Sequence, residues 1–133
     1  MASDLQPAPA SKAMFWTGWV LSVLPSLLLI FVSGSGKLMK SSQALEGFEH
    51  LGYPEQLILV LGIVEVGCTL LYLFPRTAVL GAILLTGYLG GAVASHARLL
   101  EKQFAAPFLV GVLVWLGLYL RDPRLRALVP IRK

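Results

Sequence analysis

The stretch that decides the fold is LILVLGIVEVGCTLLYLF, residues 57–74, an apolar run that carries one carboxylate, Glu65, near its middle. As a helix, about 18 apolar residues cross the ~30 Å hydrocarbon core of a bilayer. An ionisable side chain near the centre of such a span costs about 2.5–3.5 kcal/mol on insertion scales. Because the chain keeps Glu65 there despite this cost, we expect its carboxylate to have a function.

The composition is that of a membrane protein. The 133 residues leave room for one domain. Hydrophobic residues make up 56% of the chain and charged residues 14%, whereas about 25% of a typical soluble domain is charged. The mean hydropathy of +0.75 agrees with this class. The chain is therefore predicted to be an integral membrane protein.

The formal net charge of +4 indicates membrane lipid, rather than nucleic acid, as the partner of the basic residues. These residues form no stripe with interleaved aromatic side chains, and many lie in the tail from Arg121 to Lys133. Basic residues beside apolar runs contact anionic headgroups and determine topology. We therefore expect membrane lipids, and no nucleic acid, among the binding partners.

Apolar runs predict four membrane spans, at about residues 14–34, 55–74, 77–98 and 104–121. The first run, about 19 residues long, exceeds the 7–15 residues of a signal-peptide core, so we interpret it as a span. Pro25 is expected to kink this span.

Polar segments flank and interrupt the spans. Residues 1–13 are predicted to form a disordered tail, and residues 123–133 a basic C-terminal tail. SSQALEGFEHLGYP, residues 41–54, has apolar residues at helical spacing, which indicates a short amphipathic helix. The prediction is thus an all-α integral membrane protein whose membrane domain covers residues 14–122. It is a four-transmembrane-helix bundle with a short interfacial helix between spans one and two.

An even number of spans places both termini on the same side of the membrane. With the termini inside, the cytoplasmic side receives Lys12, Arg76, Arg121, Arg124, Arg126, Arg132 and Lys133. The opposite side receives Lys37, Lys40, Arg98 and Lys102. The positive-inside rule therefore predicts an inner (plasma) membrane protein with both termini in the cytoplasm.

Span three carries small residues that indicate close helix packing. Gly87 and Gly91 form a GxxxG pair, and Ser95 continues the same face. In lipid, such a face lets helix backbones approach closely. We expect the face to pack within the chain, with a homo-oligomer contact as the alternative.

Helical spacing places Glu65 on a polar stripe of span two. Cys68, Thr69 and Tyr72 follow Glu65 at three, four and seven residues, and so share its face. Lipid cannot satisfy polar groups, so this stripe is expected to line the interior of the bundle.

Lys37 follows span one, and His96 lies near the outer end of span three. With Glu65 they are expected to form a buried polar cluster near the extracytoplasmic leaflet, where Tyr88 is a further donor. The predicted ligand-binding residues are Lys37, Glu65, Thr69, Tyr72, Tyr88 and His96, and the catalytic candidates among them are Glu65 and His96.

Four interpretations of this cluster stay open. Glu65 and His96 would act as an acid–base pair on a hydrophobic substrate. The cluster would instead bind the head of a quinone, whose oxygens accept hydrogen bonds from histidine or lysine. It would line a path for protons or small solutes. In the fourth interpretation, an ion pair of Glu65 with Lys37 or His96 only fixes the packing of the helices.

Metal, haem and thiol chemistry have little support. His50 and His96 are the two histidines, and no HExxH, CxxCH or paired Cys/His spacing occurs. Cys68 is the single cysteine, so this chain can form no intramolecular disulfide or CxxC redox pair. We predict no metal site. Whether the protein is an enzyme stays open, with a non-catalytic role favoured.

Two segments carry a family resemblance, FVSGSGKLM at residues 31–39 and LGYPEQLILVLGIVEVGCTLLYLFPRTAVLGAILLTGYLGGAVASHAR at residues 51–98. Their motifs are Gly34-Ser35-Gly36-Lys37-Leu38 at the end of span one, Glu65-x-Gly67 in span two and the turn Pro75-Arg76-Thr77. With these motifs the chain resembles, over most of its length from Phe31, the DoxX-like family of small four-helix bacterial membrane proteins.

The resemblance implies a role in redox chemistry or stress response. The family takes its name from a subunit associated with thiosulfate:quinone oxidoreduction, and some relatives are linked to membrane redox or thiol-stress complexes. This sequence lacks a cysteine pair, and its first span lacks the charged residues common early in other branches of the family.

We therefore expect an accessory subunit, or a binder of a small quinone-like lipophile, in a membrane redox or stress-response system, with a redox protein as its partner. A small membrane-embedded enzyme that uses Glu65 and His96 is one alternative. Small-solute transport is the other.

Overall fold

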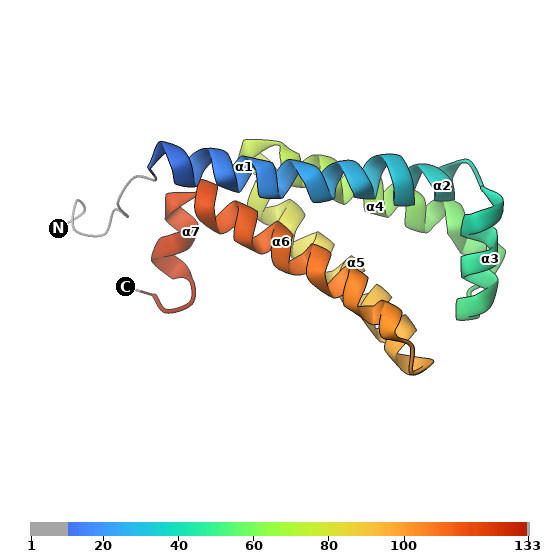
Figure 1. Ribbon diagram of the computed structural model, residues 1–133. Helices are drawn as coiled ribbons and strands as arrows, with labels where there is room; N and C mark the ends of the chain where they lie inside the picture. The colour runs from blue at the N-terminus through green and yellow to red at the C-terminus, as the bar shows by residue number, and fades with distance from the viewer. Residues whose placement is uncertain (1–10, 133) are drawn as a thin grey trace.

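The computed structural model describes residues 11–132, which form helices and no strand, arranged as a bundle with a transverse helix at one end (Figure 1). The α-helices are α1 (Lys12–Leu27), α2 (Ser35–Leu38), α3 (Ser42–Leu51), α4 (Ile58–Leu73), α5 (Ala78–Arg98), α6 (Ala105–Arg121) and α7 (Pro123–Leu128). Short π- or 3₁₀-helical segments join them: η2 (Leu28–Gly34), η3 (Glu55–Leu57), η4 (Pro75–Thr77) and η5 (Lys102–Phe104).

Four continuous helices in residues 11–132 are long and apolar enough to span a membrane. They are Lys12–Leu38, Glu55–Leu73, Pro75–Arg98 and Lys102–Arg121. The predicted all-α, four-span fold is confirmed. Both α1 and α7 lie at the same end of the bundle, opposite α3 (Figure 1).

The structure adds detail at both ends of the membrane domain. The first helix begins at Lys12, where the Ser11 side chain caps it. The predicted basic tail contains the helix α7, whose N-cap is Asp122. Residues 1–10 of the predicted disordered tail, and residue 133, lie outside the described residues.

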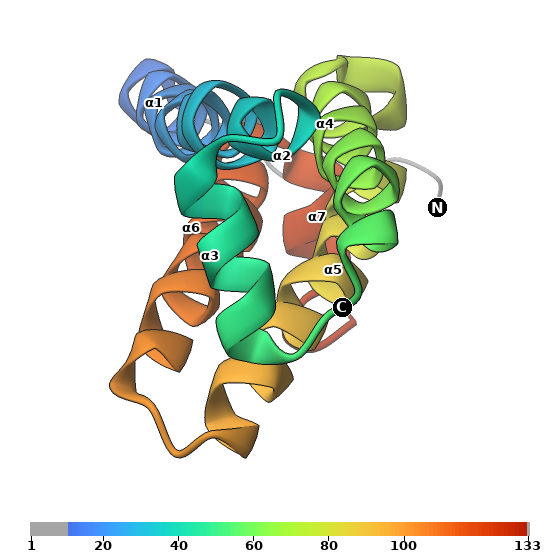
Figure 2. The same cartoon turned by 90° about the vertical axis from the view of Figure 1, so that its right-hand side faces the viewer.

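The predicted short helix between spans one and two is present as α3, and it crosses the end of the bundle (Figure 2). The Ser41 side chain caps its start by accepting a hydrogen bond from the backbone N–H of Ala44 at 3.2 Å. Gly52 ends it in the left-handed conformation, with φ 80°, which a side chain would strain. Phe48 is its buried residue and points into the bundle end.

Glycines hold α1 against α6 and α4 against α5. A Cβ atom on Gly18 would lie 2.7 Å from the backbone oxygen of Gly117, and one on Gly117 would lie 2.5 Å from Ser22 Oγ. A Cβ atom on Gly81 would lie 2.7 Å from the carbonyl carbon of Leu71. These helix pairs therefore approach as closely as they do only because no side chain stands between them.

Within residues 11–132, the GxxxG face of α5 makes no close contact of this kind with another helix. A Cβ atom on Gly87, Gly90 or Gly91 would meet nothing within 4 Å. The prediction that this face packs closely within the chain is wrong. Instead, α6 diverges from η2 and α2 towards the α3 end (Figure 1), and Gly87 and Gly91 line a cavity there.

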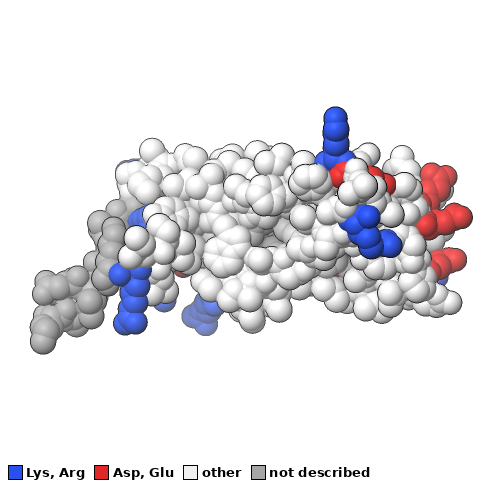
Figure 3. All heavy atoms as spheres, turned by 90° about the horizontal axis from the view of Figure 1, so that it is seen from below, with Lys and Arg blue, Asp and Glu red and all other residues white. Residues whose placement is uncertain are grey.

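The sides of the bundle are covered by exposed apolar side chains, such as Phe31, Ile63 and Leu109, which are 69%, 62% and 57% exposed. Figure 3 shows this uncharged band between the two charged ends, with Asp and Glu side chains gathered at the α3 end. An apolar belt of this kind is the surface that lipid chains cover in a membrane protein.

A substitution at Gly81 tests the close contact between α4 and α5. We expect Gly81→Ala to destabilise the protein by about 1–3 kcal/mol, because the added methyl group overlaps the α4 backbone. Gly90→Ala, on the same helix but in open space, is the matched control and gains up to about 1 kcal/mol of helix propensity. Unfolding in detergent micelles, followed by circular dichroism, measures both. Equal destabilisation by the two variants would contradict the contact.

Candidate functional site

Glu65 is buried at the centre of a hydrogen-bonded network, with 1% of its surface exposed. The ammonium of Lys37 donates to Glu65 Oε2 at 2.8 Å and to Ser33 Oγ at 2.8 Å. The hydroxyl of Tyr88 donates to the same carboxylate oxygen at 3.1 Å. The network thus joins the end of the first span to α4 and α5, and it contains one positive and one negative charge.

Lys37 reaches Glu65 because of how the first span ends. The segment η2 is π-helical, which adds residues to each turn and rotates the helix face that follows it. Glycines allow the close approach of this segment to α4. A Cβ atom on Gly62 would lie 3.0 Å from Lys37 Cβ, and one on Gly34 would lie 2.6 Å from Val66 Cγ2.

A cavity of about 500 Å³ lies beside the network, within the range typical of small-molecule sites. Four of the six predicted ligand-binding residues line it, namely Lys37, Glu65, Tyr88 and His96. Most of the wall is apolar and includes Leu28, Leu29, Phe48, Leu57, Leu89 and Val110. Because Leu28 of η2 and Ala106 of α6 are exposed, the cavity communicates with the outside of the bundle.

The other two predicted ligand-binding residues do not line this cavity. The inward stripe of α4 is confirmed, since Thr69 and Tyr72 are both buried with Glu65. However, the Thr69 hydroxyl donates back to the carbonyl of Glu65 at 2.7 Å. The Tyr72 hydroxyl oxygen lies 2.8 Å from Ser22 Oγ and 2.6 Å from the carbonyl oxygen of Val114, nearer the other end of the bundle, and its one hydrogen is shared between these two acceptors.

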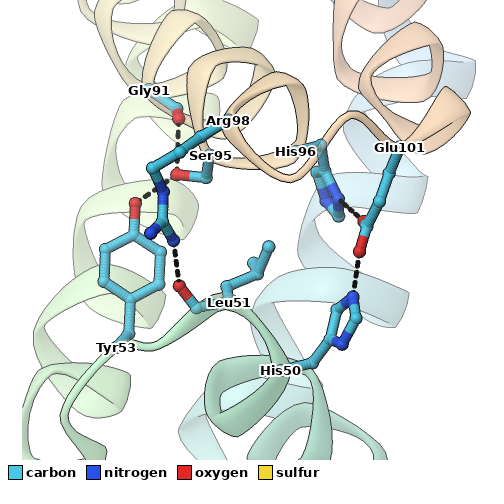
Figure 4. A network of polar contacts seen from close by, with 8 residues as sticks. All are labelled: His50, Leu51, Tyr53, Gly91, Ser95, His96, Arg98 and Glu101. Carbon is cyan, nitrogen blue, oxygen red and sulfur yellow. Dashed lines mark hydrogen bonds and ion pairs between the residues drawn. The ribbon is translucent and has the colours of Figure 1, made fainter.

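His96 lines the cavity, but its hydrogen-bond partner is Glu101 rather than Glu65. Its Nδ1 atom lies 3.0 Å from Glu101 Oε2, and Nε2 of His50 on α3 contacts the other carboxylate oxygen (Figure 4). The predicted cluster of Lys37, Glu65 and His96 is therefore divided. Lys37 and Glu65 form an ion pair, whereas His96 belongs to a separate contact between α3 and the end of α5.

Two more contacts attach α3 and the loop after it to α5 (Figure 4). The guanidinium of Arg98 donates to the carbonyl of Leu51, and the hydroxyl groups of Tyr53 and Ser95 are hydrogen-bonded to each other. Leu51 and Tyr53 also line the cavity, as Phe48 of α3 does. The polar contacts therefore keep α3 in place as a cover over one end of the cavity.

The sequence prediction missed the part of the site that α3 and its following loop contribute. Tyr53 and Ser95 line the cavity and join its two walls, although neither was among the predicted ligand-binding residues. The sequence position of each residue nevertheless indicates that it could line the cavity. Ser95 continues the face of Gly87 and Gly91, and Tyr53 follows the glycine that ends α3.

The two histidines lower the pKa of Glu101 below its ordinary value of 4.5, first through the hydrogen bond with His96 and then through that with His50. A carboxyl group whose pKa is lowered by folding contributes stability above its unfolded pKa. That contribution is lost as the pH falls through the lowered pKa. The contact of α3 with α5 therefore weakens in acid.

We expect the backbone amides of α3 to exchange hydrogen faster, relative to their intrinsic rates, at about pH 3.5 than at about pH 6. Glu101→Gln, which removes the carboxylate between His50 and His96, should loosen α3 at pH 6 and abolish the difference. Glu49→Gln changes an exposed carboxylate on α3 and is the control. Hydrogen–deuterium exchange with mass spectrometry measures these effects. Unchanged protection in Glu101→Gln would show that the contact does not hold α3.

Comparisons with known proteins place the chain in a family. A model of the DoxX-like family matches residues 20–117, which include Lys37, Glu65, Tyr88 and His96. No curated protein and no solved structure matches the chain. Because the family match covers well over half of the chain, the protein belongs to the DoxX-like family.

Proposed function

We propose that this membrane protein binds a small lipophilic molecule with a hydrogen-bonding head, of which a quinone is the best fit. It would act as an accessory subunit of a membrane redox or stress-response system, with a redox protein as partner. One observation carries the proposal: an apolar cavity of about 500 Å³ meets the buried network of Lys37, Glu65 and Tyr88. A polar network that only fixed helix packing would have no need of an open cavity beside it.

The donors on the cavity wall suit the oxygens of a quinone, which accept hydrogen bonds. An ammonium group has three N–H donors. Among residues 11–132, Lys37 uses two of them on Ser33 and Glu65, so a third is available to a ligand. His96 also lines the cavity, and when both of its ring nitrogens carry a proton, Nδ1–H donates to Glu101 and Nε2–H is left for a second oxygen. The apolar wall between these groups would contact the ring and tail.

The same contacts favour binding over acid–base catalysis by Glu65 and His96. An acid–base pair must reach the same reacting group, directly or through one water molecule. Glu65 Oε2 already accepts hydrogen bonds from Lys37 and Tyr88, and His96 is bonded to Glu101. The two candidates are thus each held by other partners.

We further propose that α7 and both termini lie in the cytoplasm, with the protein in the inner membrane. Basic residues at the α7 end, such as Arg76 and Arg124, support this orientation through the positive-inside rule. The α3 end carries a cluster of carboxylates (Figure 3): Glu46, Glu49, Glu55 and Glu101. The cavity would then lie nearer the extracytoplasmic face.

Filling the cavity tests the proposed binding site. Ala92 lines the cavity, so we expect Ala92→Phe to lower the affinity for decylubiquinone by about tenfold or more, because the ring occupies the ligand's space. Ala94→Phe adds the same ring to an exposed position of the same helix outside the cavity and should leave the affinity unchanged. Isothermal titration calorimetry of the protein in detergent micelles measures the three affinities. If the wild-type protein and both variants bind decylubiquinone equally well, the ligand binds outside this cavity.

A second ligand tests recognition of the head. Decylbenzene keeps a six-membered carbon ring and the decyl tail but has none of the probe's oxygens, and a hydrogen bond to a charged donor contributes about 1.5–3 kcal/mol. The wild-type protein should therefore bind decylubiquinone at least about tenfold more tightly. If the two compounds bind equally well, the cavity is a nonspecific apolar space and Lys37 has no role in recognition.

The orientation is tested separately on whole cells. We expect a C-terminal tag to be protected from external protease in spheroplasts, because the α7 end faces the cytoplasm. In a Cys68→Ala background, Glu46→Cys on the exposed surface of α3 should react with a membrane-impermeant maleimide added outside. If protease digests the tag from outside and position 46 is not labelled, the orientation is the reverse of the proposed one.

A further inference from the structure

Arg121 lies beside a second cavity, of about 300 Å³, at the end of the bundle opposite α3. The end of α6 and the starts of α1, α5 and α7 form its wall, together with Pro75 of η4. Arg121 is only 7% exposed, although it is in the last turn of α6. This cavity shares no lining residue with the one beside Glu65.

Within residues 11–132, the hydrogen bonds and ring contacts of the Arg121 side chain are with uncharged groups. Its Nε atom donates to Ser22 Oγ at 3.0 Å, and Nη2 donates to the carbonyl of Tyr72 at 3.1 Å. The guanidinium carbon lies 4.1 Å from the centre of the Trp19 ring and 5.0 Å from that of the Tyr72 ring. A guanidinium has five N–H donors, and these two hydrogen bonds use two of them.

No carboxylate within residues 11–132 neutralises Arg121. The ion pairs in this part of the chain join Lys37 to Glu65, and His50 and His96 to Glu101. Asp122 is on the cavity wall, but its carboxylate caps α7 by accepting a hydrogen bond from the backbone N–H of Arg124 at 2.9 Å. The carbonyls at the C-terminus of α6 supply only about half a negative charge.

We propose that this second cavity binds the phosphate group of an anionic phospholipid. Guanidinium groups pair with phosphate through two parallel hydrogen bonds, and the exposed Arg124 is a second cation on the wall. With Asp122 counted, the wall keeps one net positive charge. Trp19 and Phe15 are also on the wall, and aromatic side chains are common at the level of the headgroups.

The position of the cavity supports lipid as the source of the phosphate. Arg121 is the last residue of the fourth candidate span, and Pro75 on the same wall is the first residue of the third. Span ends lie where headgroups lie, and basic pockets between membrane helices bind anionic headgroups. The exposed Phe15, at 39%, continues the wall onto the apolar side of the bundle, where the acyl chains would run.

Competition between lipids tests the proposal. The full-length protein in detergent micelles is given equal amounts of phosphatidylglycerol and phosphatidylcholine, and native mass spectrometry counts the retained lipids. We expect phosphatidylglycerol to be retained about tenfold better. Arg124→Gln should weaken its retention about fivefold, the effect of one basic residue near an anionic headgroup. Arg76→Gln removes an equal charge from the same end, outside the cavity, and should have no effect.

Arg121→Gln should abolish the preference for phosphatidylglycerol. Circular dichroism shows whether this variant folds, and Arg124→Gln carries the test if it does not. Equal retention of the two lipids by the wild-type protein, or equal losses in Arg124→Gln and Arg76→Gln, would overturn the site. Inorganic phosphate is added in a separate arm. If it binds while the protein shows no lipid preference, the assignment to a lipid is wrong.

Discussion

The ion pair between Lys37 and Glu65 is the contact on which the α3 end of the bundle depends. The helical backbone satisfies its own polar groups within lipid, but a charged side chain needs a partner. Glu65 has two, because Lys37 and Tyr88 both donate to the same carboxylate oxygen. Removing one partner of a buried ion pair costs about 3–5 kcal/mol in soluble proteins, since the other charge is left uncompensated. The pair thereby ties the end of the first span to α4.

This tie matters because α6 diverges from the first span towards the α3 end, whereas the end of the first span stays packed on α4. Near α7, Gly18 and Gly117 let α1 and α6 meet, and Gly81 brings α5 against α4. Towards α3, α6 diverges from the first span, and Gly87, Gly90 and Gly91 of α5 face open space instead of a neighbouring backbone. Side-chain contacts span the gap there. Lys37 bridges to Glu65, and α3 bridges to α5 through His50, with a cavity left between.

The parts of this arrangement that repeat along one helix could be predicted from the sequence. Hydropathy located the four spans, and helical spacing located the buried stripe of α4. Spacing determines the face of a residue but not its partner. Tyr72 shares the face of Glu65 yet bonds to Ser22, two helical turns nearer the other end of the bundle. Nor does a GxxxG pattern tell whether a helix or a cavity lies opposite it.

The contacts that depend on loops could not be predicted in this way. The chain after α5 turns back so that Glu101 meets His96, with Leu100 at a positive φ of 58°, a conformation that hydropathy does not encode. The amphipathic pattern of α3 predicted that a helix would form. It carried no information on which element its apolar face would cover, and so the contribution of Phe48 and Tyr53 to the cavity was not foreseen.

The two buried charges of the spans, Glu65 and Arg121, are satisfied in different ways, and their depth explains the difference. Glu65 lies in the middle of a span, away from the headgroups, and its counter-ion comes from the chain itself. Arg121 ends a span, where backbone carbonyl dipoles, aromatic rings and the headgroup region together stabilise a cation. A guanidinium without a carboxylate partner is therefore tolerable at the end of α6, whereas the same group at the depth of Glu65 would require an acidic partner within the bundle.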